Sequence, residues 1–178
     1  MPNYIALIRG INVGGQKKLP MAELREALTK SGLEQVKTYI QTGNVIFKHF
    51  KVEVSKLENH IVSVIKERFG YDVEVIVKQP EEIQTVIDNC PFPQEKMEKS
   101  YFTILHKQPE ETRIQNLQEI EFPEEEFVVT LQCVYLFSAA GYGRAKANNN
   151  FFEKKLKVNA TSRNYKTMTK LLSLCQDL

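Results

Sequence analysis

Apolar residues change their spacing several times along the chain, and each change marks the boundary of a predicted element. Apolar runs rich in β-branched residues predict strands at Tyr4–Arg9, Val36–Ile40, Val45–Phe50 and Val73–Val77. Spacings of three and four between apolar residues predict a helix that begins near Pro20 and ends at Gly32. A second helix opens at Ser55 and Glu58, which have the spacing of a capping box. Residues 1–78 therefore predict the order β-α-β-β-α-β, that of a ferredoxin-like unit.

The second half repeats this pattern in part. A third helix, which ends at Cys90 before Pro91, predicts a connector over residues 79–100. Strands are then predicted at Tyr101–His106, Phe127–Leu131 and Val134–Phe137. Helices are predicted at Glu110–Ile120, from a cap at Asn150 and Glu153 through Leu156, and along the apolar residues from Met168 to Leu178. No final strand is evident, so residues 101–178 predict a related but incomplete β-α-β-β-α-α unit that ends in basic helices. The predicted fold class is α+β.

A ferredoxin-like order brings two polar segments of the first half together. Each α-crossover returns the chain to its starting end, so the end of the first strand and the turn between the second and third strands share one end of the sheet. Those segments are the loop Gly10–Leu19 and the turn Gln41–Asn44. We expect them to meet.

The loop Gly10–Leu19 has the composition of an anion site. It spans ten residues, whereas connections of this kind usually take about two to six. Arg9 and Lys17 supply charge, Asn12 supplies an amide, and Gly14 and Gly15 let main-chain N–H groups approach a ligand. The alternative is that the glycines only turn the chain and the lysines lie in water.

Two amides of the turn, Gln41 and Asn44, would lie beside this loop. Asparagine is also common in turns, where it bonds its own main chain, so both interpretations stay open.

Two familiar nucleotide motifs are absent. Gly10 and Gly15 have the spacing of a phosphate-binding P-loop, but Gln16 and Lys17 follow where that motif needs Lys and then Ser or Thr. No GxGxxG fingerprint is present, and the predicted sheet lacks the parallel order that dinucleotide folds use. These patterns argue against a P-loop ATPase and a dehydrogenase.

Charge is unevenly distributed along the chain. Eight basic residues and one acid lie between Arg144 and Lys170, whereas twelve acids and four basic residues lie between Glu81 and Glu126. Such asymmetry favours the binding of a polyanion at one face of the protein, or it reflects charged helix faces that lie in solvent. Within the basic segment, Arg163 and Asn164 precede the last helix and form either an anion site or an ordinary N-cap.

Composition narrows the class of protein. The chain has 178 residues with a net charge of +2, and its three cysteines form no CxxC pair. Its three histidines have no metal-ligand spacing, so no metal site and no cofactor are predicted. Cys90 continues an apolar stripe and is expected to pack rather than react. No apolar run reaches membrane-spanning length, and a cytoplasmic protein is expected.

Three segments resemble a bacterial family known as domain of unknown function 1697. They are YIALIRGINVGG with PMAELR after it, TYIQTGNVIF, and ATSRNY before an apolar helix. The family more often has Thr at Ser162 and Trp at Tyr165. The resemblance covers essentially the whole chain and implies an α+β protein of ferredoxin-like topology. It implies no activity, catalytic residue or cofactor.

Our leading hypothesis is a protein that binds a phosphate-bearing ligand, nucleic acid or a nucleotide, through the loop, the turn and the basic C-terminal region. Alternatives are an enzyme that acts on a small anionic metabolite and a structural protein that binds a partner.

Overall fold

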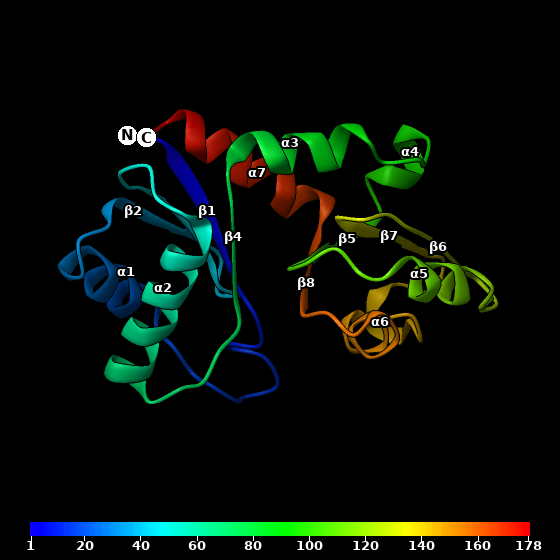
Figure 1. Cartoon of the computed structure of the whole chain (residues 1–178), viewed down its shortest axis with the longest axis horizontal. Coiled ribbons are helices and arrows are strands. Elements are labelled where there is room, and N and C mark those ends of the chain that lie inside the picture. The colour runs from blue at the N-terminus through cyan, green and yellow to red at the C-terminus, as the bar shows by residue number, and fades with distance from the viewer. The chain divides into compact units, whose positions relative to one another are not determined.

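Eight strands and seven α-helices make up a mixed α+β fold, and the computed structural model describes the whole chain, residues 1–178 (Figure 1). The strands are β1 (Asn3–Ile8), β2 (Glu34–Tyr39), β3 (Asn44–Lys48), β4 (Val75–Lys78), β5 (Tyr101–Leu105), β6 (Glu125–Val129), β7 (Cys133–Ser138) and β8 (Ala160–Asn164). The helices are α1 (Met21–Lys30), α2 (Val54–Phe69), α3 (Pro80–Asp88), α4 (Gln94–Met97), α5 (Glu111–Gln118), α6 (Asn149–Leu156) and α7 (Tyr165–Gln176), with a 3-10 turn η1 (Tyr142–Arg144).

The chain forms two compact units. The first unit contains Met1–Gln84 and Lys170–Leu178, and the second contains Thr85–Thr169. The last turns of α7 thus belong to the first unit, although they are far from its other residues in the sequence. The predicted division into 1–78, 79–100 and 101–178 follows the order of the chain and assigns these turns to its last segment.

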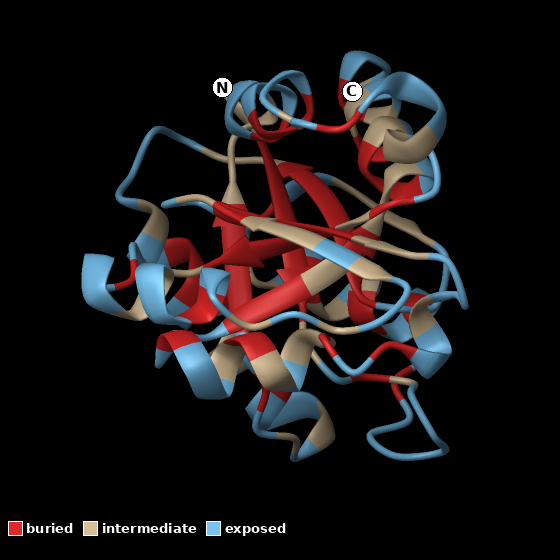
Figure 2. Cartoon of the chain, turned by 90° about the vertical axis from the view of Figure 1, so that its right-hand side faces the viewer, coloured by how far each residue is buried: buried red, intermediate tan, exposed pale blue.

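The first unit is built on an antiparallel sheet in the order β2-β3-β1-β4. Tyr4, Ala6 and Ile8 alternate along β1 and join the core that α1 and α2 cover. The residues between them, Ile5 and Leu7, are buried as well. Because β1 is buried on both faces, its sequence is a continuous apolar run rather than an alternating one. Figure 2 shows the strands mostly as buried and the helices buried along one side only.

The second unit has an antiparallel sheet in the order β6-β7-β5-β8. Leu117 of α5 and Phe152 of α6 pack into its core with Val134 and Leu136 of β7. The sheet has a fourth strand, because β8 pairs with β5 from Tyr101 opposite Asn164 to Leu105 opposite Ala160.

The prediction of a missing final strand is therefore wrong. The segment Ala160–Asn164 contains a single apolar residue, so it has no hydrophobic period from which a strand can be recognised. Main-chain pairing with β5 holds it instead, together with a hydrogen bond of 2.7 Å between the hydroxyls of Ser162 and Thr103.

The capping box predicted at the start of α2 is also absent. The helix begins at Val54 with Glu53 as its N-cap, and no side chain caps it. Glu58 is instead buried, and its carboxylate accepts a hydrogen bond of 3.0 Å from the main-chain N–H of Val77 in β4. Because the helix starts two residues earlier than a capping box at Ser55 and Glu58 requires, these residues occupy other positions of the first turns.

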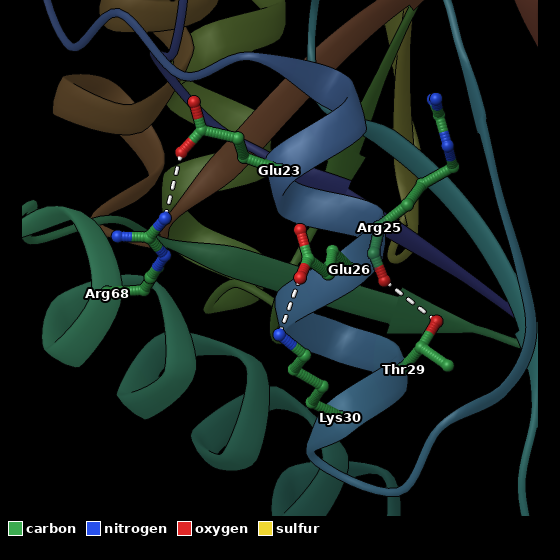
Figure 3. A network of polar contacts seen from close by, with 6 residues as sticks. All are labelled: Glu23, Arg25, Glu26, Thr29, Lys30 and Arg68. Atoms are coloured by element: carbon green, nitrogen blue, oxygen red, sulfur yellow. Dashed lines mark hydrogen bonds and ion pairs between the residues drawn. The ribbon is translucent and has the colours of Figure 1, made fainter.

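Ion pairs on α1 lie at the surface (Figure 3). Glu26 pairs with Lys30 at 2.5 Å along the helix, and Glu23 pairs with Arg68 of α2 at 3.2 Å. Exposed pairs of this kind contribute only about 0 to 1 kcal/mol each. The apolar stripe of α1, with Leu24 and Leu28 fully buried, therefore dominates its attachment to the sheet.

Candidate functional site

The glycine-rich loop after β1 is a small hairpin. Val13 and Gln16 form a bridge, with the Gln16 N–H donating to the Val13 carbonyl at 3.1 Å. Below it, the Asn12 N–H donates to the Lys17 carbonyl at 3.2 Å. Residues 12–18, the hairpin and the lysine after it, are called the finger from here on. Gly14 and Gly15 are the two central residues of the hairpin, at φ of 59° and 75°, and positive φ at both positions is the requirement of a type I′ turn. The two glycines thus turn the chain tightly.

Asn12 fixes the base of the finger. Its Oδ1 accepts from the Leu19 N–H at 2.8 Å, and its Nδ2 donates to the Leu19 carbonyl at 2.9 Å and to the Gln41 carbonyl at 2.7 Å. Asn12 itself has a φ of 54°, a conformation that asparagine tolerates better than most residues. One side chain therefore closes the loop and joins it to the turn Gln41–Asn44.

The turn also packs directly on the end of β1. The Ile8 N–H donates to the Gly43 carbonyl at 2.8 Å. A Cβ atom on Gly43 would lie 2.8 Å from the Ile8 Cβ and 2.9 Å from the Ile8 carbonyl oxygen, and Gly43 has a φ of 81°. Only glycine satisfies both conditions. The loop and the turn thus meet, as the strand order requires.

The two amides of the turn have different environments. Asn44 is fully buried, and its Nδ2 donates to the Tyr39 carbonyl at 3.1 Å and to the Thr42 hydroxyl at 3.0 Å. This geometry is that of an asparagine that shapes its own turn. Gln41 is exposed, and its main-chain carbonyl receives the bond from Asn12.

Lys17 is held against the segment that follows α2. Its Nζ donates to the main-chain carbonyl of Asp72 at 2.5 Å, and the hydroxyl of Tyr71 donates to the Lys18 carbonyl at 3.0 Å. The pKa of Asp72 is lowered, chiefly by its hydrogen bond from Lys66 and the charge of Lys66, with a smaller effect of Lys17. Sequence reasoning missed Tyr71 and Asp72, since they directly follow the helix-ending Gly70 and carry no motif.

The exposed chemistry of this end of the first unit is simple. The side chains of Val13, Gln16 and Lys18 are exposed, Val13 to 60%. Arg9 is half-buried at the end of β1, and its main-chain N–H donates to the Glu74 carbonyl at 2.9 Å. The finger therefore presents an ammonium group, a carboxamide and an apolar side chain on a fixed base.

Arg163 and Asn164 lie in the second unit, on β8. Arg163 is only 8% exposed, and its Nη1 donates to the Thr161 hydroxyl at 2.7 Å and to the Ser162 carbonyl at 2.9 Å. Burial lowers the pKa of Arg163 to about 10. Asn164 accepts a hydrogen bond of 2.8 Å from the Thr167 N–H, so it caps α7.

Most of the acidic segment and most of the basic segment belong to the second unit. Exposed Lys154, Lys155 and Lys157 belong to α6 and its end, and α6 packs beside α5, which begins at Glu111. The helix that carries basic residues thus has an acidic residue on the helix beside it. Opposite charges on neighbouring helices weaken the field that the basic segment presents to a polyanion.

The cysteines show no activated thiol. Burial raises the pKa of Cys90, Cys133 and Cys175, that of Cys175 to about 11. An elevated pKa lowers the thiolate population and with it the reactivity. No group of three or more His, Cys, Asp or Glu residues has an arrangement that could hold a metal ion.

Comparisons with known proteins agree with the fold. Residues 1–135 match the model of a family described as "Protein of unknown function (DUF1697)". The fold is similar to a solved structure, that of the conserved bacterial protein SP0830 from Streptococcus pneumoniae, with a TM-score of 0.75 and 24% sequence identity over 97% of this chain and 98% of that one. No curated protein matches the sequence. None of the helices is long and apolar enough to cross a membrane.

Proposed function

The chain belongs to the DUF1697 family of proteins of unknown function, and for this chain we propose binding of a phosphate-bearing ligand, nucleic acid in particular, at the finger and the adjoining turn. The observation that carries this proposal is the exposed finger on an immobilised base. Asn12, Lys17 and Tyr71 hold the finger through hydrogen bonds of 2.5 to 3.2 Å.

Rigidity matters because a preordered segment loses less conformational entropy when it binds. The hydrogen bonds of Asn12 use main-chain groups of Leu19 and Gln41, so they persist whatever the solvent-exposed side chains do. In this proposal Asn12 and Asn44 are positioning residues that shape the loop and the turn.

Contacts to the ligand come from the exposed groups. Lys18 offers an ammonium group, and Gln41 offers a carboxamide beside the finger. An ammonium has three N–H donors, so Lys17 can keep its bond to the Asp72 carbonyl and still donate to a phosphate. Gly14 and Gly15 have no side chain to keep a phosphate oxygen away from the main-chain N–H groups at the tip. Arg9, at the end of β1, adds a further cation.

Salt-dependent binding tests the proposal. Fluorescence anisotropy of labelled DNA of about 20 nucleotides, single-stranded and duplex, is measured between about 50 and 300 mM KCl. We expect log K to fall linearly with log[KCl], with a slope that counts the phosphates contacted. Lys18→Ala is expected to weaken binding and to reduce the slope by about 0.9 for duplex or about 0.7 for single strands.

Lys56→Ala is the matched control. Lys56 is exposed at the start of α2. This helix follows the end of β3 that is opposite to Asn44, so the substitution removes the same charge from the opposite end of the sheet. An unchanged slope is expected. Absence of binding at the lowest salt, or an equal effect of both substitutions, would contradict the proposal.

We also propose that each unit is a variant of the ferredoxin-like fold. Supporting this, the first unit has the element order β-α-β-β-α-β and the second contains β5, α5, β6, β7, α6 and β8 in the same order. The strand orders β2-β3-β1-β4 and β6-β7-β5-β8 correspond position by position. Expression of residues 85–169 alone would test whether the second unit folds independently.

A further inference from the structure

Two exposed apolar side chains lie where the finger meets the turn. Val13 is 60% exposed and directly follows Asn12, and Ile40 is 48% exposed and directly precedes Gln41. The two residues therefore flank the hydrogen bond of 2.7 Å that joins the Asn12 side chain to the Gln41 carbonyl. Neither of them belongs to the hydrophobic core of the first unit.

The backbone of Ile40 is strained. Its φ is 50°, in the left-handed region, where a β-branched residue is a genuine outlier. Glycine or asparagine adopts this conformation at a lower cost, so the backbone gives no reason for an isoleucine at this position. Because half of the side chain is exposed, packing within the unit does not explain it either.

Both neighbours of Ile40 are fixed, so the turn keeps this conformation. The Tyr39 carbonyl accepts from the Asn44 Nδ2 at 3.1 Å, and the Gln41 carbonyl accepts from the Asn12 Nδ2 at 2.7 Å. A residue in a costly conformation persists only where its surroundings determine it, and such residues cluster at ligand sites. The exposed Ile40 side chain is thus held at a fixed place beside the finger.

Positive charge lies next to these apolar side chains. Lys17 and Lys18 belong to the same finger as Val13, and Lys18 is exposed. Asp72, whose main-chain carbonyl holds Lys17, pairs its own carboxylate with Lys66 at 2.8 Å. A ligand that suits this surface has phosphates for the ammonium groups and flat apolar faces for the two apolar side chains.

We infer that Val13 and Ile40 contact the faces of unpaired bases and that the ligand is a single strand of nucleic acid, which rests on the function proposed for the finger and specifies its substrate class. In a duplex each base face is covered by its neighbours in the stack, so an apolar side chain reaches it only at the cost of unstacking. A single strand offers the same faces at a lower cost. Every base has such a face, so binding of this kind tolerates any sequence.

The test compares three labelled DNA ligands of about 20 nucleotides by fluorescence anisotropy: a single strand, its duplex, and an abasic strand that keeps the phosphates and lacks the bases. A site that only neutralises phosphates favours the duplex, because its charge density is higher. We expect the opposite order, with the single strand bound at least about tenfold more tightly than the duplex or the abasic strand. A single-stranded RNA of the same sequence identifies the preferred sugar, since contacts to bases and phosphates are common to both strands.

Val13→Thr removes apolar surface and keeps the branched shape and the charge. We expect it to weaken single-strand binding about three- to tenfold and to leave the salt slope unchanged, because no charge is lost. Val52→Thr is the matched control and should change neither, since Val52 is 36% exposed and follows β3 at the end opposite to Asn44. Ile40→Asn should weaken binding and raise the urea midpoint, because asparagine tolerates the left-handed backbone.

The possible outcomes separate base contact from phosphate binding. Equal affinity for the abasic strand, tighter binding of the duplex, or an equal effect of Val13→Thr and Val52→Thr would overturn the inference and leave phosphate binding at the finger in place. Unchanged binding or a lower urea midpoint in Ile40→Asn would likewise contradict the role of Ile40. Absence of binding of every strand at the lowest salt would overturn both the inference and the proposed function.

Discussion

Replacement of Asn12 should loosen the finger and destabilise the first unit. The side chain makes three hydrogen bonds of 2.7 to 2.9 Å to Leu19 and Gln41. Each such bond contributes about 0.5 to 1.5 kcal/mol net, and the one to Gln41 is exposed and therefore at the lower end. Their loss predicts a decrease of about 2 to 3 kcal/mol in the free energy of unfolding.

Replacement of Asn12 has a second effect, backbone strain, which two variants separate from the loss of hydrogen bonds. Its φ of 54° is in the left-handed region, which glycine adopts freely and alanine does not. Asn12→Gly therefore measures the lost hydrogen bonds together with the flexibility of glycine. Asn12→Ala should be less stable still, by about 1 kcal/mol.

Urea denaturation of both variants and of Lys18→Ala, a neighbouring exposed side chain, provides the measurement. Lys18→Ala should stay within about 0.5 kcal/mol of the wild type. Heteronuclear NOE values of residues 13–18 should fall in both Asn12 variants. If the Asn12 variants unfold at the wild-type urea concentration and keep their NOE values, Asn12 does not hold the finger and the reasoning is refuted.

Three further outcomes follow from single residues. Gly43→Ala should lower the free energy of unfolding by about 2 to 4 kcal/mol, since its Cβ would lie 2.8 Å from the Ile8 Cβ; a near-neutral result in urea denaturation would mean that the turn moves away from β1. Tyr4→Phe should unfold no earlier than the wild type and gain up to about 1 to 2 kcal/mol, because the buried Tyr4 hydroxyl has no hydrogen-bond partner; a lower melting temperature would contradict this. Cys175, with a pKa of about 11 against 9.0 for the ordinary thiol, should be about 0.1% thiolate at pH 8 and react about 100-fold more slowly with a disulfide reagent than in the unfolded chain. Because the folded state holds this proton more tightly, the stability that the thiol contributes is complete below about pH 9 and decreases toward pH 11, and Cys175→Val should abolish that part of the alkaline loss.

The elements with a strong hydrophobic period were predictable from the sequence. Helix α1 begins at Met21, next to the predicted start at Pro20, and β1 was found within one residue because its apolar run is continuous. Strand β8 was not found, since hydroxyl, guanidinium and amide side chains conceal a strand that main-chain pairing holds. The role of Glu58 escaped for a similar reason, because its partner Val77 is 19 residues away.

The candidate site was predictable in its location and less so in its detail. The strand order brings the loop and the turn together, and this follows because each α-crossover returns the chain to its starting end. The sequence left open whether each polar residue binds a ligand or shapes the local main chain. Asn44 is buried in its own turn and Asn164 caps a helix, whereas Lys17 is bonded to a main-chain carbonyl 55 residues away.

The sequence by itself determined the order of the elements in the first unit and the end of its sheet where the glycine-rich loop lies, because apolar spacing, glycine and proline act on the chain locally. Only the tertiary structure decided that the loop is a hairpin locked by Asn12, that Arg163 is buried on β8, and that the last turns of α7 close a groove with α3. Hydrogen-bond partners far apart in the chain, and surfaces formed by segments from both ends of it, leave no trace in the period of a sequence, since any of several polar residues satisfies the same local pattern.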